Sequence, residues 1–205
     1  MRRLLIVRHG ETLQNTQGLM VSTDDPALSG AGESQVMALA EALAHIPMTR
    51  VITSPMRRCR QTTDALVAAQ VLPVPVEVDD RLRELRFGDI EGLGPREIAA
   101  RGLGEVFLAW RQGRPPLYPA GAETFEDAAV RLRAAYDDAT LRQEQCTVLV
   151  GHSHALRIVL AVSVLGVDPE VHRRMRLDHG AMTEVQWEND VPRLTALNAR
   201  SLPAR

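Results

Sequence analysis

Three short segments of the chain carry histidine, arginine or both beside hydroxyl-bearing side chains. They read RHGET at residues 8–12, SPMRRCRQT at residues 54–62 and GHSH at residues 151–154, and a carboxylate, Glu84, lies between the last two. Arginine forks bind phosphate oxygens in bidentate fashion. A neutral imidazole can attack phosphorus, a second, protonated imidazole can stabilise the transferring group, and a carboxylic acid can protonate the departing alkoxide. The residue types therefore predict phosphoryl transfer that needs no metal ion.

Each of these segments, and Glu84 as well, follows a short apolar run that we predict to be a strand, and we expect the first of these strands to be buried and parallel. The runs span residues 3–7, 51–53, 74–78 and 147–150. Taken alone, a histidine at a strand end is more often structural, and an arginine-rich first helical turn is more often exposed. In an open α/β sheet, however, ligands bind beyond the carboxyl ends of the strands. We therefore expect the polar segments to meet at one edge of one sheet.

Helical periodicity between these runs supplies the elements that would cover the sheet. Ser29 can cap a helix whose inner positions are Val36, Leu39, Ala40 and Leu43. Thr124 opens TFED, a capping-box-like start for a long amphipathic helix. A further helix is expected over residues 56–70, with Ala65, Leu66 and Ala69 on its inner face. Another is expected from the end of the fourth strand to about Leu165. Weaker helical patches lie near residues 95–101 and 104–112.

The alternation of strands and helices predicts a single doubly wound α/β domain over residues 1–205. We expect a three-layer αβα sandwich with a mostly parallel sheet and an antiparallel edge. Residues 183–187 and 193–197 read as the hairpin that would form this edge. Residues 85–122, rich in glycine, proline and arginine, are expected to be an insertion that covers the active site.

The composition narrows the class of protein. With 45% apolar residues, 24% charged residues and a net charge of −2, the chain reads as an ordinary globular protein and not as a nucleic-acid binder. No apolar run approaches the length of about 18 to 20 residues that spans a bilayer, and the four apolar residues after Met1-Arg2-Arg3 are too few for a secretory signal. We expect a cytoplasmic protein with a small phosphorylated metabolite as its partner, no nucleic acid, no membrane and no cofactor. A homodimer is left open.

Two residue types exclude other chemistries. All 24 basic residues are arginine, so mechanisms that need a lysine, such as the phosphate-binding lysine of a P-loop or a Schiff base, do not apply. The two cysteines, Cys59 and Cys146, fit neither a disulfide framework nor a zinc site.

The polar segments together resemble the motifs of the histidine phosphatase superfamily, which includes the cofactor-dependent phosphoglycerate mutases. RHGET with Asn15 is similar to the family signature, and SPMRRCRQT is similar to its second arginine motif. LRELRFGDIEG resembles the acid motif, and VLVGHSHALRIVL resembles the motif of the second histidine. The four motifs occur in the family's order and cover most of residues 3–166.

The resemblance implies a role for each residue that matches a motif position. His9 would be the nucleophile that becomes phosphohistidine, and Arg8 and Arg58 would bind the phosphoryl oxygens. Glu84 would donate a proton to the leaving group and later activate water. His152 would complete the phosphate pocket. The neighbours of Arg58, namely Arg57 and Arg60, would be exposed helix charges.

Other positions depart from the family pattern or match it less closely. Asn15 would contact the phosphate or the substrate, and Ser22 is a candidate contact although the family often has Gly-Gln where this chain has Val21-Ser22. Ser153 replaces a usual glycine and can still offer its backbone N–H at a helix start. His154 is an additional histidine that we expect to be structural. The remaining histidines, expected to be packing or surface residues, are His45, His172 and His179.

The resemblance leaves three activities open. A phosphatase lets water attack phosphohistidine, a mutase returns the phosphoryl group to a second hydroxyl, and an inactive relative only binds a phosphorylated ligand. The insertion is shorter than in the mutases and all five catalytic roles are filled, which favours a phosphatase. Arginines in the covering segment could recognise a second anionic group, or could be ordinary surface residues; they are Arg101, Arg111 and Arg114. The substrate among small phosphomonoesters stays open.

Overall fold

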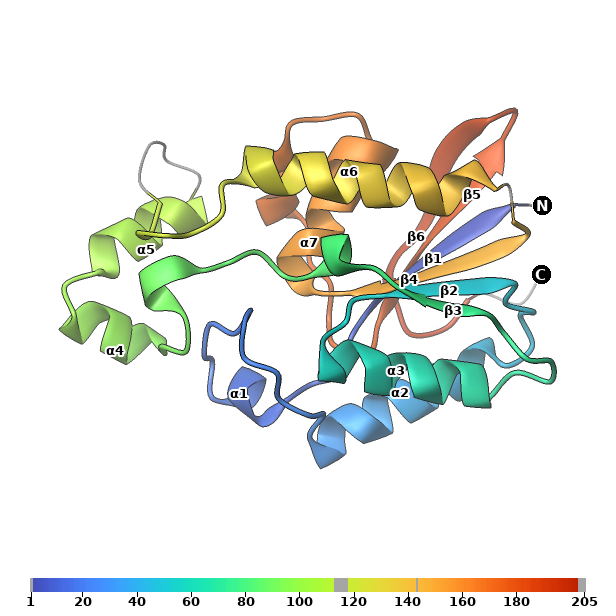
Figure 1. Cartoon of the computed structure of the whole chain (residues 1–205), viewed down its shortest axis with the longest axis horizontal. Coiled ribbons are helices and arrows are strands. Elements are labelled where there is room, and N and C mark those ends of the chain that lie inside the picture. Colours follow the sequence, from blue (N-terminus) through green and yellow to red (C-terminus); the bar gives the residue numbers. More distant parts are fainter. Residues whose placement is uncertain (1, 113–117, 143, 203–205) are drawn as a thin grey trace.

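A six-stranded mixed sheet forms the centre of the protein, as seen in a computed structural model that describes residues 2–112, 118–142 and 144–202 (Figure 1). The strand order is β3-β2-β4-β1-β5-β6. Pairing is parallel from β3 through β1, whereas β5 and β6 form the antiparallel edge. The strands are β1 (Arg3–Arg8), β2 (Arg50–Thr53), β3 (Val76–Val78), β4 (Cys146–Gly151), β5 (Met182–Glu188) and β6 (Val191–Ala199).

The register of the three central strands brings their carboxyl ends level. Arg8 on β1 lies opposite Gly151 on β4, and Thr53 on β2 lies opposite Val150. The ladder continues one step further, because the His9 N–H donates to the Gly151 carbonyl at 3.0 Å and the Ser54 N–H donates to the Val150 carbonyl at 3.0 Å. The polar segments that follow these strands therefore start at the same edge, as predicted.

Helices cover both faces of the sheet, which confirms the three-layer arrangement. In Figure 1, α2 (Gly30–Leu43) and α3 (Arg57–Ala68) lie on one face, and α6 (Phe125–Leu141) and α7 (Ser153–Val159) lie on the other. The helix α7 continues into a π-helical segment, η3 (Leu160–Val164).

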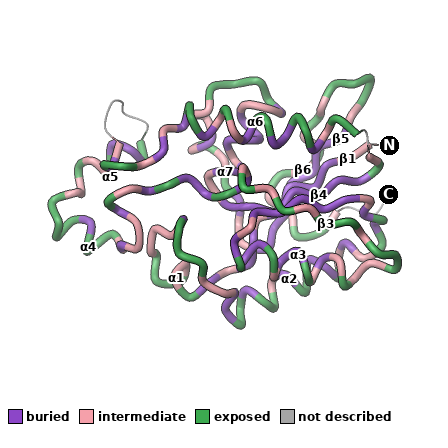
Figure 2. The backbone as a smooth tube through the Cα atoms, in the orientation of Figure 1, coloured by how far each residue is buried: buried purple, intermediate pink, exposed green. Residues whose placement is uncertain are grey.

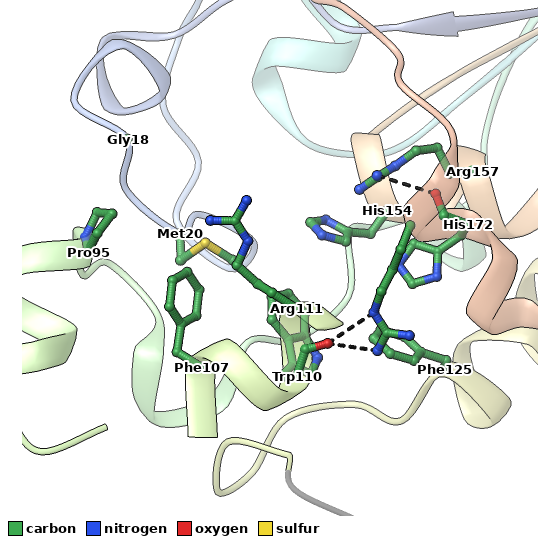
Figure 3. Close-up of a pocket in the computed structure, with 11 residues that line it drawn as sticks. Gly18, Met20, Pro95, Phe107, Trp110, Arg111, Phe125, His154, Arg157 and His172 are labelled. Atoms are coloured by element: carbon green, nitrogen blue, oxygen red, sulfur yellow. Dashed lines mark hydrogen bonds between the residues drawn. The ribbon is translucent and has the colours of Figure 1, made fainter. Parts of the chain in front are cut away.

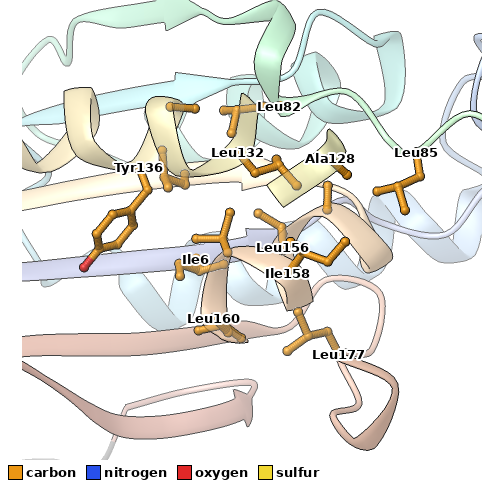
Figure 4. Packing of buried hydrophobic residues seen from close by; sticks show 14 of the residues in the cluster. Ile6, Leu82, Leu85, Ala128, Leu132, Tyr136, Leu156, Ile158, Leu160 and Leu177 are labelled. Atoms are coloured by element: carbon orange, nitrogen blue, oxygen red, sulfur yellow. The ribbon is translucent and has the colours of Figure 1, made fainter. Parts of the chain in front are cut away.

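The alternation of side chains along β1 builds two cores. Leu5 faces α2 and packs in a cluster with Leu39, whereas Ile6 packs with Leu132 and Leu156 (Figure 4). The residues of β4 are accordingly buried along the whole strand, and those of β1 are buried except at its two ends (Figure 2).

Two predicted helix caps are present. The Ser29 hydroxyl accepts from the Gly32 N–H at 3.1 Å, and the Thr124 hydroxyl accepts from the Asp127 N–H at 3.1 Å. The inner face of α2 carries the four predicted residues.

The predicted inner face of α3 is wrong in part. Leu66 is buried, but Ala65 and Ala69 are only partly so, and the buried face carries Arg58, Cys59, Thr62 and Thr63. The helix is rotated toward the site, since the guanidinium of Arg58 points into the protein and hydrogen-bonds there.

The irregular stretch after β3 joins the core on the α6 side of the sheet. Its short elements bring Ile90, Ile98 and Trp110 into the same cluster as α6. In Figure 1, α4 and α5 lie beyond the end of the sheet, next to the polar segments. The elements are η1 (Asp80–Leu82), η2 (Gly88–Ile90), α4 (Pro95–Ala100) and α5 (Gly104–Gln112), and two further short ones are α1 (Leu13–Thr16) and η4 (Pro169–Arg174). Within the described ranges, no helix has the length and apolar character needed to cross a membrane.

Candidate active site

His9 is buried at the carboxyl end of β1, with its ring fixed in one tautomer. Its Nδ1 lies 2.7 Å from the Gly10 carbonyl oxygen, which can only accept, so Nδ1 carries the proton and the Nε2 lone pair is free. Burial lowers the pKa of His9 well below its usual value, and the nearby His152, Arg58 and Arg8 lower it further. His9 is therefore a neutral imidazole, which is the form that a nucleophile requires.

His152 follows β4 and faces His9 edge-on, with ring centroids 5.2 Å apart. The Arg58 Nε–H donates to Nδ1 of His152 at 3.3 Å, so the His152 proton is on Nε2, which donates to the Ser54 hydroxyl at 2.8 Å. Burial, followed by the charge of Arg58, lowers the pKa of His152 to about 3. We expected a protonated second histidine; the structure instead holds a neutral one.

Arg58 lies in the first turn of α3 and is almost fully buried, at 2% exposure. Besides His152, its guanidinium donates to the backbone carbonyls of Asp24 at 2.8 Å and Ser22 at 3.4 Å. No carboxylate within ion-pair distance neutralises it among the residues that the structure describes. The neighbours Arg57 and Arg60 are exposed, as predicted.

Arg8 is aimed by two partners that come from the segment before β5. It donates to the Leu177 carbonyl at 2.6 Å and to Nε2 of His179 at 2.6 Å. Burial lowers the pKa of Arg8 to about 10, so the guanidinium stays charged near neutral pH. The His179 ring also lies 5.5 Å from the His9 ring, and burial together with Arg8 lowers its pKa to about 3.

Glu84 is held at the amino end of α7. Its carboxylate accepts from the backbone N–H groups of Ala155 at 2.9 Å, His154 at 3.1 Å and Leu85 at 3.1 Å, and lies 3.4 Å from Nδ1 of His154. Burial alone would raise the pKa of Glu84, but the hydrogen bonds from the ring and backbone of His154, with those from the backbone N–H groups of Ala155 and Leu85, keep it well below the usual value. Glu84 is a carboxylate in the free protein.

The three residues predicted as further phosphate or substrate contacts, Asn15, Ser22 and Ser153, lie in different surroundings. The Asn15 carbonyl oxygen caps its own loop through Thr12, while its amide nitrogen has no hydrogen-bond partner among the described residues and can donate to a ligand. Ser22 donates its hydroxyl to Glu91 at 2.6 Å and its carbonyl supports Arg58, so it orders the loop beneath that arginine. Ser153 is the first residue of α7, and its N–H is one that the helix does not use. Their contacts with phosphate stay predictions.

A cavity of about 350 Å³ opens beside His154, the residue whose backbone and ring contact Glu84 (Figure 3). His154 lies at its boundary, and aromatic side chains from α5 and the start of α6 form much of its wall. Of the arginines predicted to recognise a second anion, Arg111 lines this cavity, Arg101 instead pairs with Glu97 on the surface of α4, and Arg114 lies outside the described residues.

The sequence reasoning missed three residues of the site. His179 and His172 were expected to be packing or surface residues, but His179 holds Arg8 and His172 lines the cavity. Ser54 was read only as part of a motif, yet it binds His152. The predicted hairpin carried a usable signal, because a strand antiparallel to β1 begins at the edge where β1 ends, and His179 lies just before that strand.

Comparison with known proteins places the chain among phosphoryl-transfer enzymes. It matches the histidine phosphatase superfamily (branch 1) over residues 4–200. A protein named "Probable phosphoglycerate mutase GpmB" from Yersinia enterocolitica is 31% identical over 194 residues, covering 92% of this chain and 86% of the relative. The mycobacterial glucosyl-3-phosphoglycerate phosphatase Rv2419c, solved in complex with VO3, is 30% identical with a TM-score of 0.84, over 97% of this chain and 100% of that chain.

A further solved structure shows the likeness of fold alone: the alpha-ribazole phosphatase from Shigella flexneri has a TM-score of 0.86 at 24% identity, over 99% of both chains. The chain belongs to the histidine phosphatase superfamily, as its motifs predicted. It is a phosphatase-type enzyme of that family, whose relatives carry the names of phosphatases or mutases.

Proposed function

We propose that the protein is a phosphomonoesterase that hydrolyses a small phosphorylated metabolite through a covalent phosphohistidine on His9. The observation that carries the proposal is the His9 ring. Its Nδ1–H is tied to the Gly10 carbonyl, so the Nε2 lone pair lies free in a buried pocket near two arginines. A neutral imidazole beside fixed positive charge suits attack on a phosphoryl group.

The reaction proceeds in two displacements. Nε2 of His9 forms a bond to phosphorus while the bond from phosphorus to the leaving oxygen breaks, and Glu84 gives that oxygen a proton that it has received from the singly protonated phosphomonoester. Water then attacks phosphorus and gives its proton to the Glu84 carboxylate, and the nitrogen–phosphorus bond breaks. Arg8 and Arg58 stabilise the phosphoryl oxygens in both steps. Each role is filled by a protein group, so we expect excess EDTA to leave the rate unchanged.

The first test is the substitution His9→Ala, measured with p-nitrophenyl phosphate. Loss of the nucleophile removes the covalent route, so hydrolysis should fall to background. The matched pair Arg58→Ala and Arg57→Ala tests the phosphate contact. Substitution of the buried Arg58 should lower kcat/KM by about 10²- to 10³-fold, whereas substitution of the exposed Arg57 should lower it little. Near-normal activity of His9→Ala would overturn the proposal.

Glu84→Gln separates the proton donor from a merely structural acid. Nitrophenolate leaves without a proton, but the alkoxide of glycerol phosphate does not. We therefore expect the kcat/KM of the variant to fall by about 10²- to 10⁴-fold with glycerol phosphate and by much less with p-nitrophenyl phosphate. Equal losses with both substrates would contradict the assigned role.

A second candidate function is phosphoryl transfer between two hydroxyls, as in a phosphoglycerate mutase. The name of the Yersinia relative favours it, whereas the phosphatase with 30% identity favours hydrolysis. Isomerisation of 3-phosphoglycerate with added 2,3-bisphosphoglycerate distinguishes the two, because a mutase turns over rapidly only when that cofactor is present.

A further inference from the structure

The cavity beside His154 has an unusual combination of walls. Phe107 and Trp110 stand nearly parallel, with ring planes 22° apart, and Phe125 lies 6.0 Å from Trp110. Met20 and Pro95 complete the apolar part. At about 350 Å³ the cavity is near the lower end of the range for small-molecule sites, which is about 300 to 1,000 Å³. Its size fits one ring with a substituent.

The polar part of the cavity is cationic. Arg111, Arg157 and Arg173 all line it. Arg173 is paired with Glu170, but within the described ranges neither Arg111 nor Arg157 lies within ion-pair distance of a carboxylate. Arg157 is held by the backbone carbonyls of Ser153 at 3.0 Å and Met175 at 3.1 Å. Two guanidinium groups thus bring positive charge to the cavity without a balancing partner.

The cavity also has a defined relation to the chemistry. His154 lines it in Figure 3, and the backbone N–H and ring of the same residue contact Glu84. On the proposed mechanism, the oxygen that Glu84 protonates belongs to the leaving group. The cavity is thus separated from the proton donor of the leaving group by one residue, His154.

We propose that this cavity receives the alcohol portion of the substrate and selects leaving groups that carry a flat ring and a second negative charge. The proposal rests on the phosphatase function given above and adds a substrate class to it. The ring packs against the aromatic side chains that line the cavity, and the second anion, a carboxylate or a phosphate, pairs with Arg111 and Arg157.

The test for charge compares two substrates of the same shape, 4-carboxyphenyl phosphate and its uncharged analogue 4-carbamoylphenyl phosphate. We expect wild-type kcat/KM to favour the carboxylate by about tenfold or more. Arg111→Met should reduce this preference several-fold. Arg101→Met is the matched control, since Arg101 lies in the same covering segment but pairs with Glu97 outside the cavity, and it should leave the preference unchanged.

A binding measurement makes the result independent of turnover. On the His9→Ala background, calorimetry should show that 4-carboxyphenyl phosphate binds about tenfold more tightly than both the carbamoyl analogue and 3-phosphoglycerate, which has a carboxylate but no ring. If wild type hydrolyses both aryl phosphates but shows no preference in rate or in binding, this inference is overturned and the phosphatase function stands. If wild type hydrolyses neither aryl phosphate but the binding preference is present, the phosphatase function is overturned instead.

Discussion

Glu84 and His9 lie in one site, yet the free protein holds both without the proton that an acid catalyst would need. Three backbone N–H groups and His154 keep Glu84 ionised, while burial keeps His9 neutral. On the proposed mechanism, a proton for the leaving group must therefore arrive with the substrate. A phosphomonoester supplies it in its singly protonated form, since its second pKa is about 6, and transfer of that proton to Glu84 prepares the acid.

This proton balance predicts an acidic pH optimum. Above the second pKa of the phosphate, about 6, the reactive form becomes scarcer, and kcat/KM should fall about tenfold per pH unit. The direction of this change follows from the lowered pKa of Glu84. Because Glu84 holds no proton of its own near neutral pH, the rate depends on the protonated form of the substrate. An acid that kept its own proton would give a flat pH profile in this range. The measurement is kcat/KM for glycerol phosphate from about pH 5 to 8, and a flat profile would contradict the prediction.

The role of His179 escaped prediction for a reason that can be named. His179 acts through Arg8, a neighbour that is distant in sequence. Motif spacing reports residues that follow strands, because the strand fixes their place. It does not report a residue that approaches the same point from another segment.

At the scale of elements, the loop after β1 is fixed by its close approach to α2. A Cβ atom added to Gly32 would lie 2.0 Å from the Glu11 carbonyl oxygen, and one added to Gly10 would lie 2.6 Å from the Gly32 carbonyl oxygen. Such distances leave no room for any side chain. The glycines allow the first turn of α2 to press against the segment that carries His9.

Gly32→Ala should therefore move this loop and destabilise the protein. We expect a loss of about 1 to 3 kcal/mol in the free energy of unfolding, which is typical of overpacking, together with reduced kcat as His9 shifts. Gly30→Ala is the control in the same helix, because nothing lies within 4 Å of its added methyl group. Urea unfolding followed by tryptophan fluorescence measures both. Equal unfolding midpoints for Gly32→Ala and wild type would show that the backbone yields easily.

The elements themselves were largely predictable from sequence. The apolar runs gave the buried strands β1, β2 and β4, and the two weak helical patches correspond to α4 and α5. The face of α3 was not predictable, because Arg58 is buried, against the usual tendency of arginine, where it donates to His152 and to two backbone carbonyls. Packing rules fail at such a position since these hydrogen bonds set its orientation.

For the whole molecule, the collection of polar groups at one sheet edge has a consequence for stability. Burial lowers the pKa of every histidine in and around the site. The values reach about 3 for His152, His172 and His179, compared with 6.5 for an exposed imidazole. The folded protein keeps these rings neutral, whereas the unfolded chain protonates them below about pH 6.5.

The free energy of unfolding should therefore decrease as the pH falls from 6.5 toward 3. The unfolded state binds more protons in this window, and each such histidine contributes a slope of about 1.4 kcal/mol per pH unit. His172→Asn should reduce the slope by about that amount between pH 5.5 and 4, whatever it does to the stability at neutral pH. The exposed His45→Asn serves as the control. Urea unfolding at a series of pH values gives the slopes, and identical slopes for His172→Asn and wild type would show that the buried ring accepts a proton in the folded protein.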